Sequence, residues 1–63
     1  MRKWLRIARV EKDMSQKKLC EKIGISQPSY CLIENGKVNP RPSTAKKIAA
    51  VLGVDWTRFY DEV

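Results

Sequence analysis

The chain has 63 residues, 43% of them hydrophobic, and 13 Lys and Arg against 7 Asp and Glu give a formal net charge of +6 at pH 7. This length allows one domain and leaves no room for an active-site cleft between two lobes, and the apolar fraction argues against disorder. The positive charge makes nucleic acid or an anionic membrane surface the candidate partner.

Residues that usually carry catalysis or bind metals are scarce. There is no histidine, and Cys20 and Cys31 form no CxxC pair, so we expect two reduced thiols, no metal and no cofactor. Neither cysteine has an obvious activating partner and the carboxylates are scattered, so we do not expect an enzyme. No apolar run approaches the roughly 18 residues of a membrane span, and no signal core follows the charged N-terminus. We therefore expect a cytoplasmic protein without a membrane partner.

Hydrophobic spacing and breaker residues divide the chain into five short helical segments. The first is expected from about Arg2 to Lys12. Its inward face is predicted to contain Trp4, Leu5, Ala8 and Met14, and its solvated face Arg2, Lys3, Arg6 and Lys12. The second begins at the N-cap candidate Ser15 and ends at Gly24, which suits a position of positive φ.

The third segment begins after the N-cap candidate Ser26 and ends at Asn35-Gly36, with Pro28 in the first turn, where its missing N–H costs nothing. A loop over residues 37–42 follows. Ser43 is then expected to cap a fourth helix, which Gly53 ends. That helix carries an amphipathic stripe of Ala45, Ile48, Ala49 and Leu52.

The last segment is a turn or two capped by Asp55. It carries Trp56, Phe59 and Tyr60, which are expected either to pack in the core or to form a contact with another protein.

Residues 15–36 predict two helices of about eight residues joined by Gly24-Ile25-Ser26. A short turn containing glycine lets two helices meet at a steep angle, as in a helix-turn-helix; an ordinary helical hairpin has the same spacing. Gln27, Pro28, Ser29 and Leu32 are not needed for the core. Gln27 can bond adenine N6 and N7, and Leu32 or Pro28 can pack on a thymine methyl, although the spacing alone favours an ordinary surface residue at a helix N-terminus for Gln27.

Phosphate contacts are expected on both sides of this helix. The N-terminus of the second helix, where Gln16 stands, offers free N–H groups and a partial positive charge. Asn35 and Lys37 follow the third helix, and Arg41 lies in the loop beyond. These groups are suited to holding the DNA backbone on either side of the groove.

Spaced motifs along nearly the whole chain add a resemblance. They are Leu5-Arg6-x-x-Arg9, Ser15-Gln16-x-x-Leu19, Ile23-Gly24-Ile25-Ser26, Ile33-Glu34-Asn35-Gly36-Lys37, Pro42-Ser43-Thr44-Ala45-Lys46-Lys47-Ile48-Ala49 and Leu52-Gly53-Val54. Together they resemble the Cro/C1-type (XRE) helix-turn-helix family. The resemblance implies an all-α, five-helix, lambda-repressor-like domain over residues 1–63, with the helix-turn-helix at about 15–35.

The resemblance also implies roles for single residues. Gln27, Pro28, Ser29 and Leu32 would face base edges from a recognition helix at about Gln27–Glu34. Gln16, Asn35, Lys37 and Arg41 would contact phosphates, with Gln16 also bracing Gln27. Arg9 would pair with Glu34 as a structural ion pair.

The chain departs from the family pattern at four positions. Asp13 stands where glycine is usual, Cys20 replaces alanine, Tyr30 replaces a branched aliphatic residue, and Leu32 replaces a polar or basic base reader. The first departure implies strain at the end of the first helix. The last favours contact with thymine methyls over hydrogen-bonded readout.

The resemblance implies sequence-specific binding of double-stranded DNA by a transcriptional regulator, of phage or bacterial repressor type. Such a regulator would act as a homodimer on a pseudo-palindromic operator, and the C-terminal aromatic residues are a candidate dimer contact. The alternative is a protein–protein interaction module that keeps the same fold. A basic peripheral membrane protein is less favoured because the narrow apolar stripes are all needed for the core.

Overall fold

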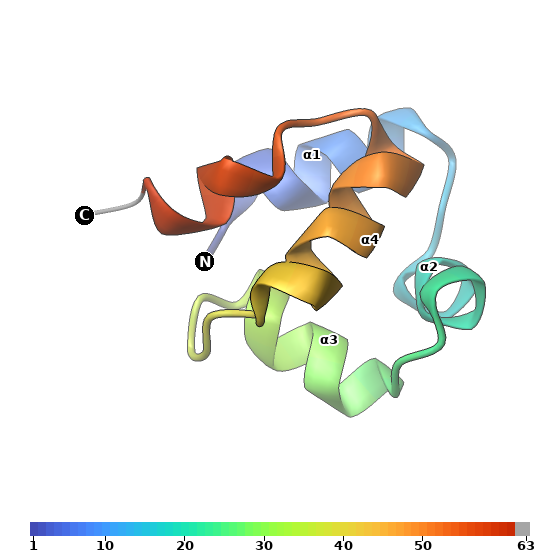
Figure 1. Ribbon diagram of the computed structural model, residues 1–63. Helices are drawn as coiled ribbons and strands as arrows, with labels where there is room; N and C mark the ends of the chain where they lie inside the picture. Colours follow the sequence, from blue (N-terminus) through green and yellow to red (C-terminus); the bar gives the residue numbers. More distant parts are fainter. Residues whose placement is uncertain (62–63) are drawn as a thin grey trace.

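The computed structural model describes residues 1–61, and every regular element in that part is helical. In chain order these are α1 (Lys3–Glu11), α2 (Gln16–Ile23), α3 (Gln27–Glu34), α4 (Pro42–Leu52) and the 3-10 helix η1 (Trp56–Tyr60) (Figure 1). The all-α prediction is confirmed. The count of five helices is corrected to four α-helices and one 3-10 helix, because the short last segment closes with the tighter bond from Arg58 N to Asp55 O.

The helix-turn-helix boundaries follow the local capping signals. Ser15 Oγ accepts a bond from Lys18 N, and Ser26 Oγ accepts one from Ser29 N. Gly24 adopts the left-handed conformation, with φ of 75°, at the end of α2. These caps satisfy backbone groups that a helix end leaves unpaired.

The predicted start of the fourth helix is wrong by two positions. Ser43 lies inside the helix, and the N-cap is Arg41, which makes no side-chain cap bond. Pro42 is the first helical residue, because its fixed φ suits that position and it has no N–H that needs a partner. The predicted cap at Asp55 is correct, since its carboxylate accepts from Thr57 N at 2.9 Å.

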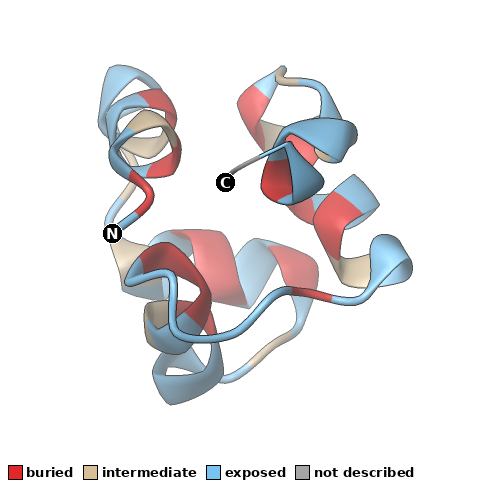
Figure 2. Ribbon diagram, turned by 90° about the vertical axis from the view of Figure 1, so that its left-hand side faces the viewer, coloured by how far each residue is buried: buried red, intermediate tan, exposed pale blue. Residues whose placement is uncertain are grey.

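The core lies where the inner faces of all five elements meet (Figure 2). Its largest fully buried side chains are Tyr30, Phe59, Leu5, Leu19 and Ile48. Phe59 brings η1 into this core and packs edge-on against Trp4 at 5.0 Å between ring centroids. Trp56 is only partly buried and Tyr60 is 41% exposed, so the C-terminal aromatic residues divide between core and surface.

Arg2 contradicts the prediction that it stays in water. Arg2 is only 3% exposed, and its guanidinium donates to the carbonyls of Ile33 and Val38 and to the side chain of Asn39. Its backbone N–H donates to the carbonyl of Glu34 at 2.8 Å. A buried arginine is tolerated when its donors are satisfied in this way. Arg2 therefore ties the start of α1 to the end of α3 and to the loop beyond it.

Asp13 has a φ of 56°, which makes it the one non-glycine residue with positive φ in the part of the chain that the structure describes. It lies in the turn between α1 and α2, at the position where the family that the chain resembles usually has glycine. A side chain with a Cβ is disfavoured in this conformation, although aspartate tolerates it better than most residues. The strain that the resemblance implies at this position therefore corresponds to the positive φ of Asp13.

We predict that Asp13→Gly raises the free energy of unfolding by about 0.5–1 kcal/mol, because relief of the backbone strain exceeds the extra entropy of glycine in the unfolded chain. Gly24→Ala is the matched control. A Cβ at Gly24 would meet nothing within 4 Å, so its expected loss of about 1 kcal/mol would come from the backbone alone. Urea unfolding measures both, and a destabilised Asp13→Gly variant would refute the explanation.

Candidate nucleic-acid interface

The turn between α2 and α3 holds the two helices in a fixed relation. Gly24 and Ile25 both donate their N–H to the carbonyl of Cys20, at 2.8 and 3.2 Å. The thiol of Cys20 points back to the carbonyl of Ser26 at 3.8 Å, and the residue is buried. A small side chain here lets the helices approach closely, so cysteine serves in place of the alanine usual in the family.

The N-terminal half of α3 is directed to solvent. Gln27, Pro28 and Ser29 are exposed, and Leu32, one turn later, is 43% exposed. The hydroxyl of Ser29 accepts a bond from the hydroxyl of Ser26 at 2.8 Å, so Ser29 also supports the helix cap. All four candidate base-reading residues are thus accessible on one short helix.

A groove of about 280 Å³ runs beside this helix. On one side α3 contributes Ser29, Leu32 and Ile33, and on the other the loop and the start of α4 contribute Val38, Asn39, Pro40, Arg41 and Thr44, with Ile25 from the turn. Val38 is 44% exposed, and the sequence analysis did not single it out. Leu32 and Val38 give the groove an accessible apolar wall of the kind that a methyl group can contact.

The buried carboxylate of Glu34 holds the far end of α3. Its Oε1 accepts from Arg9 Nε at 2.9 Å and from the hydroxyl of Tyr30 at 3.0 Å, and its Oε2 accepts from Gln16 Nε2 at 2.6 Å. Arg9 also donates to the carbonyl of Met14 at 2.7 Å. One carboxylate therefore joins α1, α2 and α3, and the Arg9–Glu34 pair is present in the structure.

This environment changes the pKa values of its members. Burial alone would raise the pKa of Glu34, but the bonds from Arg9, Gln16 and Tyr30 outweigh it and the pKa is lowered. Burial, followed by the negative charge of Glu34, raises the pKa of Tyr30. The pKa of Arg9 is raised mainly by its bond to Glu34. Glu34 is therefore an anion at neutral pH and Tyr30 a hydrogen-bond donor.

The candidate phosphate-binding residues lie at the start of α2, at the C-terminal end of α3 and in the loop that follows. Gln16 is half-buried; where the resemblance implied that it braces Gln27, its amide instead donates to Glu34. The second N–H of that amide is a further donor. Asn35 is exposed and donates to the Cys31 sulfur at 3.3 Å, and Lys37 and Arg41 are exposed in the loop beyond.

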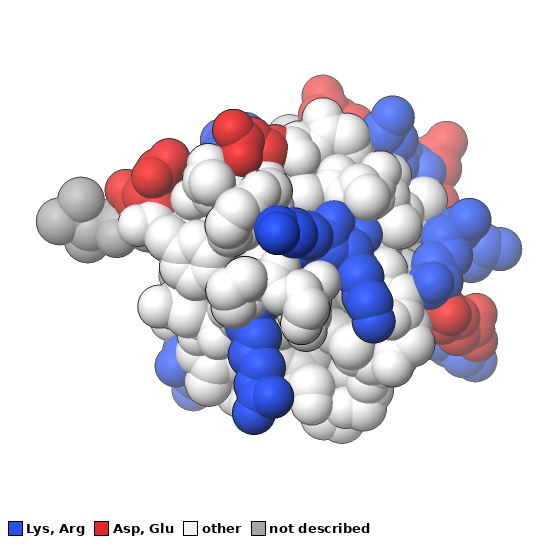
Figure 3. Space-filling model, viewed as in Figure 1, with Lys and Arg blue, Asp and Glu red and all other residues white. Residues whose placement is uncertain are grey.

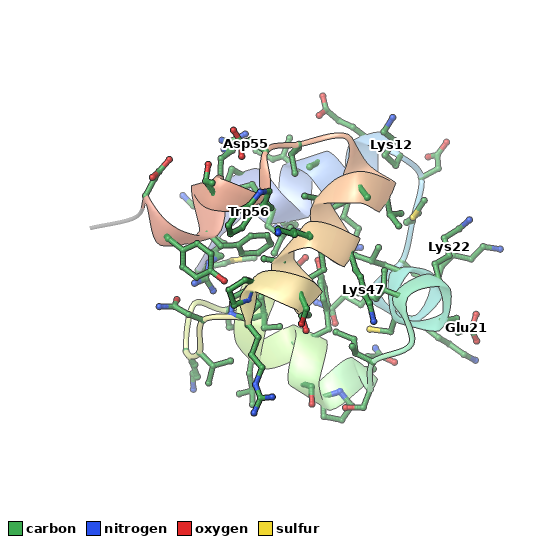
Figure 4. All side chains as sticks on the ribbon, viewed as in Figure 1. Lys12, Glu21, Lys22, Lys47, Asp55 and Trp56 are labelled. Carbon is green, nitrogen blue, oxygen red and sulfur yellow. The ribbon has the colours of Figure 1, made fainter. Side chains whose placement is uncertain are left out.

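Charge is distributed unevenly around this surface. The only charged residue within α3 is Glu34, which is 2% exposed, so the accessible part of the helix is neutral. Figure 3 shows acidic side chains mostly along the upper edge and beside α2, whereas the lower part of the view, where α3 lies, has basic and uncharged atoms. In Figure 4, Lys47 extends from α4 toward the lower side of the molecule, a cation that the sequence analysis did not single out.

Sequence reasoning also missed Arg2 and the hydroxyl of Tyr30 as parts of this architecture. No periodicity indicates a bond between residues that lie 31 or more positions apart, as Arg2 and Ile33 do. For Tyr30 a signal existed: Glu34 follows four residues later, which places the two side chains on one helix face.

The amino-acid sequence of the chain is similar to those of known helix-turn-helix proteins. The profile of the helix-turn-helix family matches residues 5–59. An uncharacterized HTH-type transcriptional regulator of Bacillus subtilis, YqaF, is 41% identical over 63 residues, which is 100% of this chain and 83% of that protein. The transcriptional repressor RstR of the cryptic phage CTXphi of Vibrio cholerae is 34% identical over 50 residues, 79% of this chain and 45% of that protein. No solved structure gives a significant match.

Within residues 1–61 no helix is long and apolar enough to cross a membrane, and no three His, Cys, Asp or Glu side chains gather as a metal would require.

We predict that Tyr30→Phe lowers the free energy of unfolding by about 1.5–3 kcal/mol at pH 7, because a charged carboxylate loses a donor. The lowered pKa of Glu34 means that its contribution is complete above the unfolded-state pKa of about 4.3 and is lost as the pH falls through the folded-state value. The deficit of Tyr30→Phe should therefore shrink between pH 7 and pH 3 in denaturant melts.

Tyr60→Phe is the control, since the Tyr60 hydroxyl donates to the backbone carbonyl of Pro40 and not to a carboxylate. Its deficit should change little with pH. A Tyr30→Phe deficit that is equally independent of pH would show that the hydroxyl does not act through the charge of Glu34.

Proposed function

Because the chain belongs to the Cro/C1-type helix-turn-helix family, we propose that it is a transcriptional regulator that binds a specific double-stranded DNA sequence. In this proposal α3 lies in the major groove and its N-terminal half reads base edges. The observation that carries the proposal is the neutral, exposed tip of α3, whose own carboxylate is buried and which is followed by the exposed cations Lys37 and Arg41 in the next loop. A phosphate backbone beside this surface would meet no exposed acidic group of α3.

Base reading is assigned to Gln27, Pro28, Ser29 and Leu32. The side-chain amide of Gln27 can donate a hydrogen bond to N7 of adenine and accept one from its N6 amino group in a single bidentate contact. Pro28 and Leu32 offer apolar surface to thymine methyls. The groove beside Leu32 extends this apolar surface to Val38.

Phosphate contacts are assigned to Gln16, Asn35, Lys37 and Arg41. Gln16 stands at the first position of α2, where backbone N–H groups and the helix dipole favour an anion. Lys37 and Arg41 lie in the loop after the C-terminal end of α3, and Arg2 fixes the position of this loop through Val38 and Asn39. Such contacts set the register of the protein on DNA and carry no sequence information.

We further propose a homodimer on a pseudo-palindromic operator, with half-sites about one helical turn apart. Phe59 is buried in the core, so the aromatic surface available for this contact is formed by Trp56 and Tyr60, whose ring centroids are 6.0 Å apart. Lys46 lies over Trp56 at 4.9 Å and borders this surface. Repression is the proposed direction of control, because the phage relative is described as a repressor.

The direct test is selection of bound duplexes from a random pool, followed by mobility shifts. We predict that Gln27→Ala weakens binding to the selected duplex by about 1–3 kcal/mol and relaxes the preference at one base pair. Lys37→Ala should weaken selected and random duplexes alike and lower the slope of log K against log salt by about 0.9. Equal loss on every duplex after Gln27→Ala would refute the reading role, and selection of nothing by the wild type would refute DNA binding.

We predict that replacing the thymine beside Leu32 with deoxyuridine weakens wild-type binding about fourfold, because one buried methyl is worth about 0.8 kcal/mol. Titration of duplexes that carry deoxyuridine at single positions locates this thymine. Leu32→Ala should bind the thymine and deoxyuridine duplexes equally, whereas Leu32→Met, which keeps apolar contact, should still distinguish them. Undiminished discrimination by Leu32→Ala would assign the methyl contact to another residue.

A further inference from the structure

The outer face of α1 exposes two large apolar side chains that the fold does not use. Ile7 is 56% exposed and Val10 is 55% exposed. With Arg6 and Glu11 they line a surface hollow of about 250 Å³. Single exposed apolar residues are common on proteins, but adjacent ones that share a hollow indicate a contact surface.

This face points away from the body of the molecule. Successive residues of an α-helix are about 100° apart, so Ile7 and Val10 lie on the side of α1 opposite Leu5 and Ala8, which are buried. In both Figure 1 and Figure 2, α1 lies at the top of the molecule and α3 at the bottom. The exposed face of α1 is therefore remote from the proposed DNA-reading surface.

We infer that this face binds the same face of a second copy of the chain, with the two α1 helices antiparallel about a two-fold axis. The order of these four residues along the helix supports this arrangement. Ile7 and Val10 lie at equal distances on either side of the point between Ala8 and Arg9, and Arg6 and Glu11 lie one residue further out on each side. A two-fold axis through that point brings Ile7 of one copy against Val10 of the other.

The same axis pairs unlike charges. Arg6 of each copy faces Glu11 of the other, so two equivalent ion pairs flank the apolar centre. A parallel arrangement would instead bring Arg6 against Arg6 and Glu11 against Glu11, which is repulsive. A two-fold contact is self-complementary by nature, and the charges on this face suit that arrangement specifically.

The contact is expected to be weak in the absence of DNA. Four side chains form a smaller patch than the roughly 800 Å² per partner of a standard interface, and the net charge of +6 makes two copies repel each other. Neutralisation of that charge by bound DNA would strengthen the association.

The consequence for regulation rests on the proposed function. Copies joined through α1 would carry their α3 helices on outer, opposite sides, so each would be available to a separate DNA duplex. This contact is distinct from the Trp56 and Tyr60 surface proposed for a dimer on one operator, and it would join operator-bound molecules to one another.

Sedimentation equilibrium of the DNA-free protein at low salt, from about 10 μM to 1 mM, tests the contact. The wild type should associate reversibly at the upper end of this range. Arg6→Glu or Glu11→Arg alone should weaken association by about tenfold or more, because each replaces two attractive pairs with two repulsive ones. An equimolar mixture of these two variants should associate at least as well as the wild type, because unlike charges then face each other again.

Lys22→Glu is the matched control, since it makes the same charge change on α2, away from α1 (Figure 4). It should associate no more weakly than the wild type. A wild type that remains monomeric at 1 mM, an Arg6→Glu variant that associates as Lys22→Glu does, or a mixture that does not recover would each overturn the proposal. Circular dichroism confirms that the variants fold.

A DNA-binding measurement distinguishes failure of this inference from failure of the proposed function. Arg6→Glu should bind a single half-site duplex within about twofold of Lys22→Glu, because Arg6 is remote from α3. Failure of the wild type to bind DNA would contradict only the proposed function, because sedimentation tests the α1 contact independently of DNA binding.

Discussion

The carboxylate of Glu34 is the group on which the arrangement of the first three helices depends. It accepts hydrogen bonds from Arg9 of α1, Gln16 of α2 and Tyr30 of its own helix. An unpaired charge with 2% exposure would be very costly, and loss of one partner of a buried pair commonly costs about 3–5 kcal/mol. Displacement of α1 or α2 would remove one of these donors, so the pairing selects one relative placement of the three helices.

A division of labour along α3 follows from this anchor. The end of the helix is fixed in the interior by Ile33 and Glu34, and the same end receives the backbone and guanidinium bonds of Arg2. The beginning of the helix carries Gln27 and Pro28 at the surface. The residues that orient α3 are therefore separate from the residues proposed to read DNA.

Local signals in the sequence were sufficient for most of the fold. Ser15, Gly24 and Ser26 fixed the limits of the helix-turn-helix because caps and left-handed turns depend on nearby residues. Ser43 was wrongly predicted as the N-cap because two signals competed, and Pro42 sets the start of the helix two positions earlier. Arg2 could not be predicted, since its burial depends on carbonyls brought close by the tertiary fold.

The candidate site was predictable to a similar degree. The residues expected at the tip of α3 are indeed accessible, because amphipathic spacing separates Gln27 and Leu32 from Tyr30 and Ile33. The partner of Gln16 was not predictable, because choosing between Gln27 and Glu34 requires the position of α2 relative to both ends of α3. The groove wall at Val38 was missed for the same reason, since it arises where the loop folds back along the helix.

The attachment of α3 by one end has an evolutionary implication. Side chains at its exposed end contribute little to the buried core, so exchanging them should cost the protein little stability and, under the proposed base-reading role, should change which base pairs it prefers. Related proteins with this fold could acquire new target sites through a few substitutions. Two such proteins in one cell could then each bind their own operators without binding those of the other. The interior bonds to Glu34 and Arg2 would meanwhile keep the scaffold unchanged.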